Sequence, residues 1–375
     1  MARLSSESLL PGGCVVVYCN RGGEAQHERA VHLELGRRLA ALQGLDFAGE
    51  FDPGHTYTGP LYFVPTGTVI GRQSAFRLGI GGEEDLFGGV VPHAFVATKA
   101  ITHPLLRAGV QAPPGWSNAF ARRVADAVLR GYTVFDLVEA REAGRLLLAE
   151  GPLRIKPVRA TAGRGQSLVR DEAELEERLQ TLDVTEVEEF GLVLEEHLEQ
   201  VSTFSVGQIR VGDLQATYYG SQRLTTDNRG EAVYGGSDLH VVAGDYDALL
   251  ALGLDEPVRL AVQQARTYDE AARECYSGLF ASRRNYDVAR GLDSRGQVRS
   301  GVLEQSWRIG GASSAEIAAL EAFREGARVV RASSLELFGE ASEPPPGARV
   351  LFRGEDEQVG FITKCVTVGS HDDAQ

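Results

Sequence analysis

Lysine is the scarcest charged residue in this chain, because only Lys99, Lys156 and Lys364 stand against 35 arginines. Lysine is normally among the commonest residues. A GC-rich genome is the ordinary cause of such a bias, so the bias by itself indicates no function. The positions where lysine persists are more informative, because a planar guanidinium group cannot replace the compact charge of an ammonium group. Lys99 and Lys156 both lie in segments with the composition of binding sites.

Long apolar runs are absent as well. The stretch after Arg145 is among the longest, and it falls far short of the roughly 20 residues that a membrane-spanning helix needs. The first 13 residues, MARLSSESLLPGG, carry one arginine and no apolar core, so they do not predict a signal peptide. We therefore expect no membrane partner and a cytoplasmic location.

The chain also lacks a basic excess, because its formal net charge is −14. Sequence-independent binding to nucleic acid depends on a basic surface that neutralises phosphates, so we expect no nucleic-acid partner. A local basic pocket for a small anion stays compatible with this charge. The four cysteines show no CxxC motif and no metal-ligand spacing with histidine, so we expect them to be reduced packing residues.

The order of the predicted elements indicates a mixed α/β protein. A buried strand over residues 13–19, a helix from His27 to Leu42, and strands at Leu61–Val64 and Val90–Phe95 predict an N-terminal α/β domain of about ninety residues. Helices are then expected over 98–110, 117–130, 136–149 and 171–179, and a strand over 192–195.

The second half favours antiparallel strands. Residues 201–242 have the pattern of a meander, and a helix over 257–272 precedes strands at 283–289 and 297–306. Ser313-Ser314-Ala315-Glu316 has the spacing of a capping box and predicts a helix to about Val329. The segment 341–347 has the composition of a linker, and the rest is expected to be an appended hairpin and tail.

Lys156 ends a predicted strand and is followed by the small-residue loop ATAGRGQS at 160–167. A lysine beside exposed backbone N–H groups can hold phosphates. The loop is not a P-loop, because no GK[ST] follows its glycines. A surface loop with one isolated lysine is the alternative interpretation.

Asp287 and Glu304 lie on adjacent predicted strands, and Ser306 is two residues beyond Glu304 on the same strand face. Carboxylates and hydroxyls are hard oxygen ligands that suit Mg²⁺, which usually completes its shell with water and substrate phosphates. An ordinary hairpin with polar residues on its wet face is the alternative.

Arg308 follows this strand directly, and Gly310 and Gly311 lead into the next predicted helix. Backbone N–H groups and the helix dipole favour an anion at such a turn, and an arginine adds a bidentate donor. A helix cap beside a surface arginine is the alternative. Arg223, Arg283 and Arg284 are further candidates for contact with an anionic substrate.

Taken in this order, the motifs resemble the ATP-grasp superfamily over roughly residues 96–330. The resemblance rests on a lysine at the head of a helix with a Gly-Val-x-x-Pro turn, a strand-end lysine with a small-residue loop, a hinge strand, and an Asp followed by a Glu-x-Asn-x-Arg motif. The matching residues here are Lys99 with 109–113, Lys156 with 160–167, Glu195-Glu196-His197-Leu198, Asp287, and Glu304-Gln305-Ser306-Trp307-Arg308.

Three positions depart from the family pattern. Ser306 occupies the place of the usual metal-binding asparagine, and Thr98 stands where an aspartate commonly precedes the first lysine. No acidic residue is evident for the ribose contact, and Glu199 is the nearest acid. The motifs match no particular ligase and resemble an uncharacterised bacterial branch.

The resemblance implies an α/β (α+β) fold. It comprises a pre-ATP-grasp α/β domain at 1–95, a first lobe at 96–200, a second lobe at 201–330, and a linker with a C-terminal hairpin at 331–375. Two lobes with antiparallel sheets would clamp the nucleotide between them. The implied site residues are Lys99, Lys156, Gly163, Arg164, Gly165, Gln166, Glu195, Glu196, His197 and Leu198 for ATP, and Asp287, Glu304 and Ser306 for Mg²⁺.

The chemistry that the resemblance implies is an ATP-dependent ligation. A carboxylate oriented by Arg308 would form an acyl phosphate, and an amine or thiol would then replace the phosphate. The carboxylate and the nucleophile cannot be identified from the residues. A phosphotransferase such as a kinase, and a nucleotide-binding protein without turnover, stay open as alternatives. A homodimer is what the family suggests.

Overall fold

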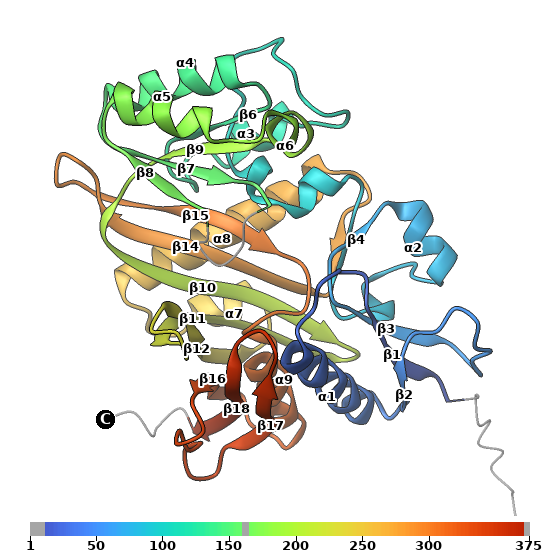
Figure 1. The fold of residues 1–375 in the computed structure, drawn as a ribbon. Coiled ribbons are helices and arrows are strands. Elements are labelled where there is room, and N and C mark those ends of the chain that lie inside the picture. Colours follow the sequence, from blue (N-terminus) through green and yellow to red (C-terminus); the bar gives the residue numbers. More distant parts are fainter. Residues whose placement is uncertain (1–11, 160–164, 371–375) are drawn as a thin grey trace, which may run out of the picture.

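A computed structural model describes residues 12–159 and 165–370 of the chain. The N-terminal region is a small α/β unit, as predicted (Figure 1). Its parallel sheet has the order β2-β1-β3, and the apolar run CVVVY of β1 is buried at its centre. The elements are β1 (Cys14–Tyr18), α1 (Gln26–Gln43), β2 (Asp46–Glu50) and β3 (Leu61–Pro65).

A short connecting region joins this unit to the rest of the molecule through a second three-stranded sheet of order β13-β5-β4. Its elements are β4 (Val69–Ile70), α2 (Arg72–Leu78), β5 (Gly89–Val91) and β13 (Phe280–Ala281), with the 3₁₀ helices η1 (Glu83–Asp85), η2 (Ala94–Ala97) and η3 (Lys99–Thr102). The strand predicted over Val90–Phe95 is therefore only partly confirmed, because it ends at Val91.

The prediction of a helix over 98–110 is wrong. The chain forms only η3, and His103 then takes an extended conformation with φ −116° and ψ 155°. Pro104 explains the stop, because the residue before a proline is sterically disfavoured in the helical region. The prediction for 117–130 is wrong in length, since α3 ends at Arg123.

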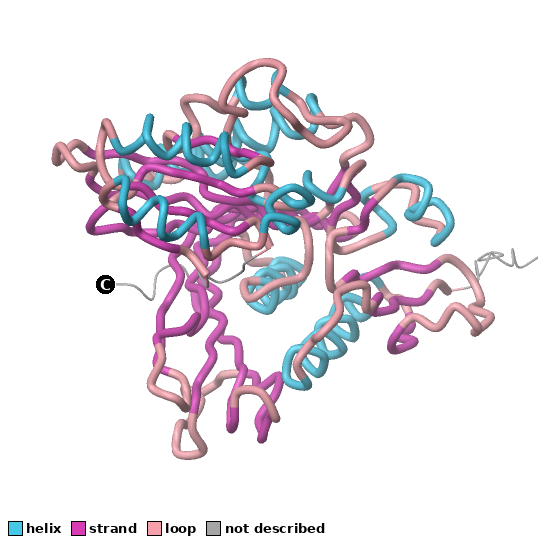
Figure 2. The backbone as a smooth tube through the Cα atoms, turned by 45° about the horizontal axis from the view of Figure 1, so that its top comes forward, coloured by secondary structure: helices cyan, strands magenta, loops and turns pink. Residues whose placement is uncertain are grey.

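The first lobe is a four-stranded antiparallel sheet of order β6-β9-β7-β8. Its helices α4 and α5 lie on the outer side of this sheet (Figures 1 and 2). Asp136 and Asp171 cap these two helices through side-chain hydrogen bonds to backbone N–H groups. The lobe contains α3 (Asn118–Arg123), β6 (Gly131–Val134), α4 (Leu137–Leu148), β7 (Leu153–Pro157), β8 (Ser167–Val169), α5 (Glu172–Gln180), α6 (Val184–Phe190) and β9 (Leu192–Glu196).

The second lobe is built on one large sheet of order β15-β14-β10-β11-β12-β16-β18-β17. The predicted meander forms β10 (Glu199–Val211), β11 (Leu214–Thr226) and β12 (Ala232–Ala243). The other elements are α7 (Tyr246–Leu250), α8 (Glu256–Cys275), β14 (Arg283–Leu292), β15 (Val298–Ser306), α9 (Ser313–Arg324), β16 (Val329–Phe338), β17 (Arg349–Asp356) and β18 (Gly360–Ser370).

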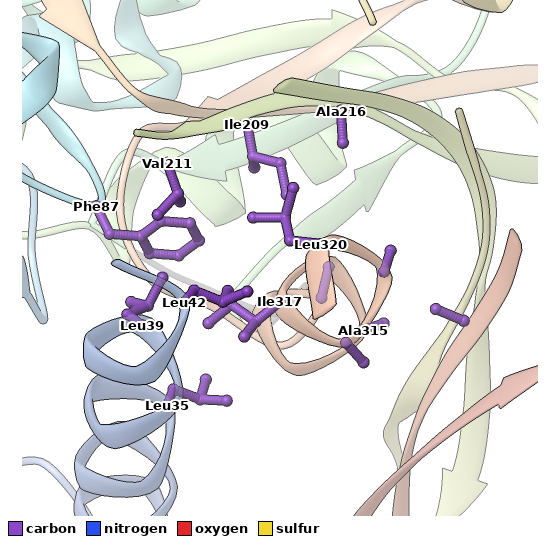
Figure 3. Packing of buried hydrophobic residues seen from close by; sticks show 14 of the residues in the cluster. Leu35, Leu39, Leu42, Phe87, Ile209, Val211, Ala216, Ala315, Ile317 and Leu320 are labelled. Atoms are coloured by element: carbon purple, nitrogen blue, oxygen red, sulfur yellow. The ribbon is translucent and has the colours of Figure 1, made fainter. Parts of the chain in front are cut away.

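Two hydrophobic cores cover the two faces of this sheet. One core joins α8 to Val206, Tyr286 and Val288. The other joins α1 and α9 to the opposite face, where Leu39, Ile317 and neighbouring residues interdigitate (Figure 3). Burial of each large apolar side chain contributes roughly 1.5–3 kcal/mol. The N-terminal unit is thereby packed against the second lobe rather than tethered to it.

The C-terminal segment is an integral part of the same sheet. The predicted hairpin is confirmed as β17–β18, but β18 pairs with β16 from Val330 to Phe338 and so extends the large sheet. His27 of α1 contacts Asp356 of β17, with Nδ1 and Oδ2 3.0 Å apart. The description of these strands as an appendage therefore needs correction.

The helix expected from Ser313 to Val329 ends at Arg324, because β16 already begins at Val329. Its predicted capping box is also wrong: Ala312 is the N-cap, and no side chain caps the helix. Ser313 Oγ instead accepts a hydrogen bond from Gly310 N at 3.0 Å. Among the helices of residues 12–159 and 165–370, none has the length and apolarity to cross a membrane.

Candidate functional site

Lys99 is the first residue of η3 and connects the two lobes. Its side chain is almost completely buried, and its Nζ lies 3.1 Å from Oε2 of Glu304 on β15. Gln305 strengthens this connection, because its Nε2 donates to the Thr98 carbonyl at 2.8 Å. The first of the two lysines and the predicted metal ligand Glu304 are thus in direct contact.

Lys156 on β7 contacts Glu195 on the neighbouring strand β9, and both side chains are buried. The second carboxylate oxygen of Glu195 lies 3.0 Å from Nε2 of His103, which is fully buried. Burial alone would raise the pKa of Glu195, but the charge of Lys156 and the hydrogen bond with His103 lower it to about 2. The carboxylate is therefore ionised and holds the ammonium group at the strand end.

The rest of the predicted hinge, residues 196–198, is braced by arginines. Glu196 accepts hydrogen bonds from Arg130 at 2.8 and 3.0 Å, and His197 Nδ1 accepts one from Arg154 at 3.1 Å. Burial and the charge of Arg154 lower the pKa of His197. Leu198 is buried in a small apolar cluster. Contacts within the protein therefore hold residues 196–198 in place.

Asp287 and Glu304 are register partners on β14 and β15. Burial and the charge of Glu304 raise the pKa of Asp287 to about 7, although Gln222 Nε2 donates to its Oδ1 at 3.0 Å. Two carboxylates held this close form a favourable place for a cation. In the part of the chain that the structure describes, no group of three or more His, Cys, Asp or Glu could hold a metal ion. Magnesium bound here would therefore need phosphate and water oxygens as well.

Ser306 is the last residue of β15 and pairs with Asn285 of β14. Its Oγ accepts a hydrogen bond from Arg283 Nη1 at 3.2 Å. Arg283 is buried and forms an ion pair with Glu316 at 2.8 Å, and Tyr218 donates to the same carboxylate at 2.5 Å. Arg283 thus links β14 to the end of β15 and already has a carboxylate partner.

Arg308 is half-buried, and no carboxylate of residues 12–159 and 165–370 lies within salt-bridge distance of it. Burial and the charges of Arg21 and Arg283 lower its pKa to about 10. Its Nη1 donates to the Ile309 carbonyl at 2.9 Å, and the turn with Gly310 follows. A desolvated cation without a carboxylate is a suitable partner for an anion.

Gly311 lies three residues after Arg308, at a position with little room for a side chain. A Cβ atom at Gly311 would lie 2.7 Å from the ring of Tyr234. The Tyr234 hydroxyl is 2.7 Å from Ser237 Oγ, and burial raises the pKa of Tyr234 to about 12. The turn is therefore fitted against the β12 strand of the sheet.

The remaining predicted residues divide into two groups. Arg223 pairs with Asp238, and Arg284 is buried with Glu83 and Gln208, so neither guanidinium group lacks a protein partner. Gly163 and Arg164 lie outside the described residues. Gly165, with φ 70°, and Gln166 precede β8 directly.

Two contacts at the site were not predicted from the sequence. His103 contacts Glu195 across 92 positions, and Glu316 neutralises Arg283 from a helix whose pattern predicts only a cap. A histidine four residues after a retained lysine was the only available signal for the first. No local pattern indicated the second, because its partners lie on distant strands.

Solved structures with the same fold include the biotin carboxylase–βγ-ATP complex from Campylobacter jejuni. It has a TM-score of 0.52 and 10% identity, and the match covers 96% of this chain and 88% of the other. Phosphoribosylamine–glycine ligase from Thermotoga maritima has a TM-score of 0.50 and 16% identity, with 96% and 94% covered. The biotin carboxylase domain of Hydrogenobacter thermophilus 2-oxoglutarate carboxylase, in complex with MgADP, has a TM-score of 0.50 and 13% identity, with 95% and 86% covered.

A search of curated proteins returns no match to this sequence. A model of one protein family matches residues 15–366, and that family is described as "Protein of unknown function (DUF3182)". The solved structures above are ATP-grasp enzymes. The chain therefore has the ATP-grasp fold and belongs to the DUF3182 family.

Proposed function

We propose that this protein binds ATP and Mg²⁺ between its two lobes and activates a small carboxylate as an acyl phosphate for ligation to an amine or thiol. The observation that carries the proposal is the contact between Lys99 and Glu304. In this contact a buried ammonium group lies beside the carboxylate pair Asp287–Glu304, although Lys99 is far from both in the sequence.

The lysines and the hinge would bind the nucleotide. Lys156 and Lys99 have buried ammonium groups that would contact the phosphates, and the segment Glu195–Leu198 would contact the base. Buried charges of this kind act strongly, because little water screens them. Lysine suits both positions, since a point charge can follow phosphate oxygens more freely than a planar fork.

Asp287 and Glu304 would hold Mg²⁺, with Ser306 as a weaker third oxygen ligand. A bound Mg²⁺ would supply positive charge that offsets the negative charge developing during transfer. Burial and the charge of Glu304 raise the pKa of Asp287, and a cation at this pair would favour its ionised form. We assign Arg283 to support of these strands, because Glu316 already neutralises its charge.

Arg308 would orient the carboxylate substrate. One carboxylate oxygen attacks the γ-phosphorus, the bond to the β-phosphate oxygen breaks, and ADP leaves. The amine or thiol then attacks the acyl carbon, and inorganic phosphate departs. Most of the rate enhancement in such steps comes from positioning and fixed charges. The fold that this chain shares with phosphoribosylamine–glycine ligase supports this reaction class.

The test is release of ADP from Mg-ATP by the full-length protein in the presence of pools of carboxylic acids and amines. We expect stimulation by one carboxylate together with one nucleophile. The double substitution Asp287→Asn and Glu304→Gln should reduce this release by at least about 100-fold, with little change in the circular dichroism spectrum. A double variant that keeps its activity would overturn the metal assignment.

The substitution Arg308→Met tests the proposed role of Arg308 in binding the carboxylate separately from any role in folding. Because the native cation is desolvated and lacks a carboxylate partner, its removal should leave the melting temperature unchanged or slightly higher. Carboxylate-dependent ADP release should nevertheless fall by about 100-fold or more, while Mg-ADP binding by calorimetry stays close to that of the wild type. A phosphorylated product formed without a nucleophile would favour the kinase alternative, and tight binding without turnover would favour a non-catalytic protein.

A further inference from the structure

His103 forms the inner end of a buried chain of three polar side chains. Its Nε2 lies 3.0 Å from one oxygen of Glu195, and the other oxygen of that carboxylate contacts Nζ of Lys156. His103 has no exposed surface, and Glu195 is 1% exposed. The position of the lysine ammonium group therefore depends on the orientation of a carboxylate that His103 holds from behind.

The backbone holds His103 firmly in place. It directly follows η3, the short helix that begins with Lys99. Thr133 of β6 binds this segment twice, because its Oγ1 donates to the Ala100 carbonyl at 2.7 Å and its N–H donates to the Pro104 carbonyl at 2.9 Å. One short segment thus positions the first lysine directly and the second lysine through His103 and Glu195.

Strand β6 packs closely against the ring of His103. A Cβ atom at Gly131 would lie 2.8 Å from Nδ1 of His103 and 2.6 Å from the Leu194 carbonyl oxygen. Within the described residues, Nδ1 has no hydrogen-bond partner. The contact with Glu195 is therefore made through Nε2, whose N–H can donate to the carboxylate. His103 thus donates to one oxygen of Glu195, while Lys156 contacts the other.

We propose that His103 is a positioning residue for nucleotide binding, which it controls by fixing the Glu195 carboxylate and, through it, the ammonium group of Lys156. This inference rests on the proposed function, because it assumes that Lys156 meets the phosphates. Without the histidine, one buried oxygen of Glu195 loses its donor. The carboxylate then turns toward Lys156 and holds the ammonium group away from the ligand.

The experiment is calorimetric titration of full-length variants with Mg-ADP. His103→Leu removes the donor and should weaken binding by about tenfold, the usual scale for one charged hydrogen bond. His103→Gln places an amide donor near the position of Nε2 and should bind within about threefold of the wild type. Leu175→Ala is the matched control, because Leu175 is buried in the same lobe away from Glu195, and it should lower stability but not affinity.

A merely structural role for His103 is tested in a second background. If His103 acts through the lysine, then His103→Leu should change affinity by less than about twofold once Lys156→Met is present. A tenfold loss that persists in that background, or unchanged binding in His103→Leu alone, would overturn the inference. If His103→Leu does not fold, His103→Asn replaces it, because asparagine is too short to reach Glu195 and should show the same loss.

The outcomes also separate this inference from the function on which it rests. Wild-type protein that binds no Mg-ADP would overturn the proposed function and this inference together. Wild-type protein that binds Mg-ADP tightly, combined with unaffected binding by the leucine variant, would overturn the role of His103 alone.

Discussion

Glu195 keeps its charge inside the protein because its two neighbours more than offset the cost of burial. Lys156 supplies a full positive charge, and His103 supplies a hydrogen bond. The ionised carboxylate of Glu195 therefore has two effects. It holds the ammonium group in place, and it links the stability of the fold to pH.

We predict that Glu195 contributes to acid unfolding. Its pKa is about 2 in the folded protein against an ordinary value of 4.5, so the ionised form stabilises the fold above pH 4.5. This stabilisation is lost as the pH falls from 4.5 to about 2. It amounts to roughly 3 kcal/mol, at about 1.4 kcal/mol per pKa unit. Urea unfolding of the wild type and of Glu195→Gln, measured from pH 5 to pH 2.5, should show a shallower pH dependence in the variant.

Glu188→Gln is the control for that measurement, since Glu188 is an exposed carboxylate close in sequence. It should keep the pH dependence of the wild type. Equal slopes for all three proteins would mean that the carboxylate of Glu195 is not held by Lys156 and His103 in solution.

Strand β6 shows how one glycine constrains an element. Gly131 pairs with Glu195 of β9, and its lack of a side chain allows the ring of His103 to lie against the strand. The local sequence predicted neither the strand at 131–134 nor this contact, because the ring arrives from a segment expected to be helical. Pro104 ends that helix early, and the resulting extended conformation at His103 directs the chain toward β6.

Gly131→Ala should therefore destabilise the protein by about 1–3 kcal/mol, the usual cost of an overpacked interior. The added methyl group would meet a backbone oxygen at 2.6 Å, which cannot move away as a flexible side chain could. Gly253→Ala provides the comparison, because no atom lies within 4 Å of a Cβ atom there. Its effect on the free energy of unfolding should stay within about 0.5 kcal/mol. Similar unfolding curves for the two variants would contradict the packing described for β6.

The C-terminal hairpin β17–β18 forms one edge of the large sheet, where β18 lies next to β16. Val366 of β18 contributes to the core that also contains α1 and α9. The N-terminal unit and the C-terminal hairpin thus share one hydrophobic core, which also contains residues of β10 and β11. The segment boundaries inferred from the motifs stay predictions, but residues 331–375 include strands of the second-lobe sheet.

Val366→Ala should lower the free energy of unfolding by about 1–3 kcal/mol, because it removes two methyl groups from a buried position. Val368→Ala, two residues further along the same strand, removes the same groups from a side chain that is 45% exposed. It should change stability by less than about 0.5 kcal/mol. Chemical denaturation of both variants checks the pair, and equal losses would show that the hairpin folds apart from the core.

The local sequence was sufficient for most strands and for the pairing of Asp287 with Glu304, because alternating apolar residues and turn residues act within a few positions. It also identified the two lysines, since their retention among so many arginines is visible without a fold. Tertiary structure alone placed Lys99 against Glu304, His103 against Glu195 and Glu316 against Arg283. These contacts join residues far apart in the chain, and no short-range preference encodes them. The packing of the two lobes creates them, and among the described residues it brings no carboxylate within salt-bridge distance of Arg308.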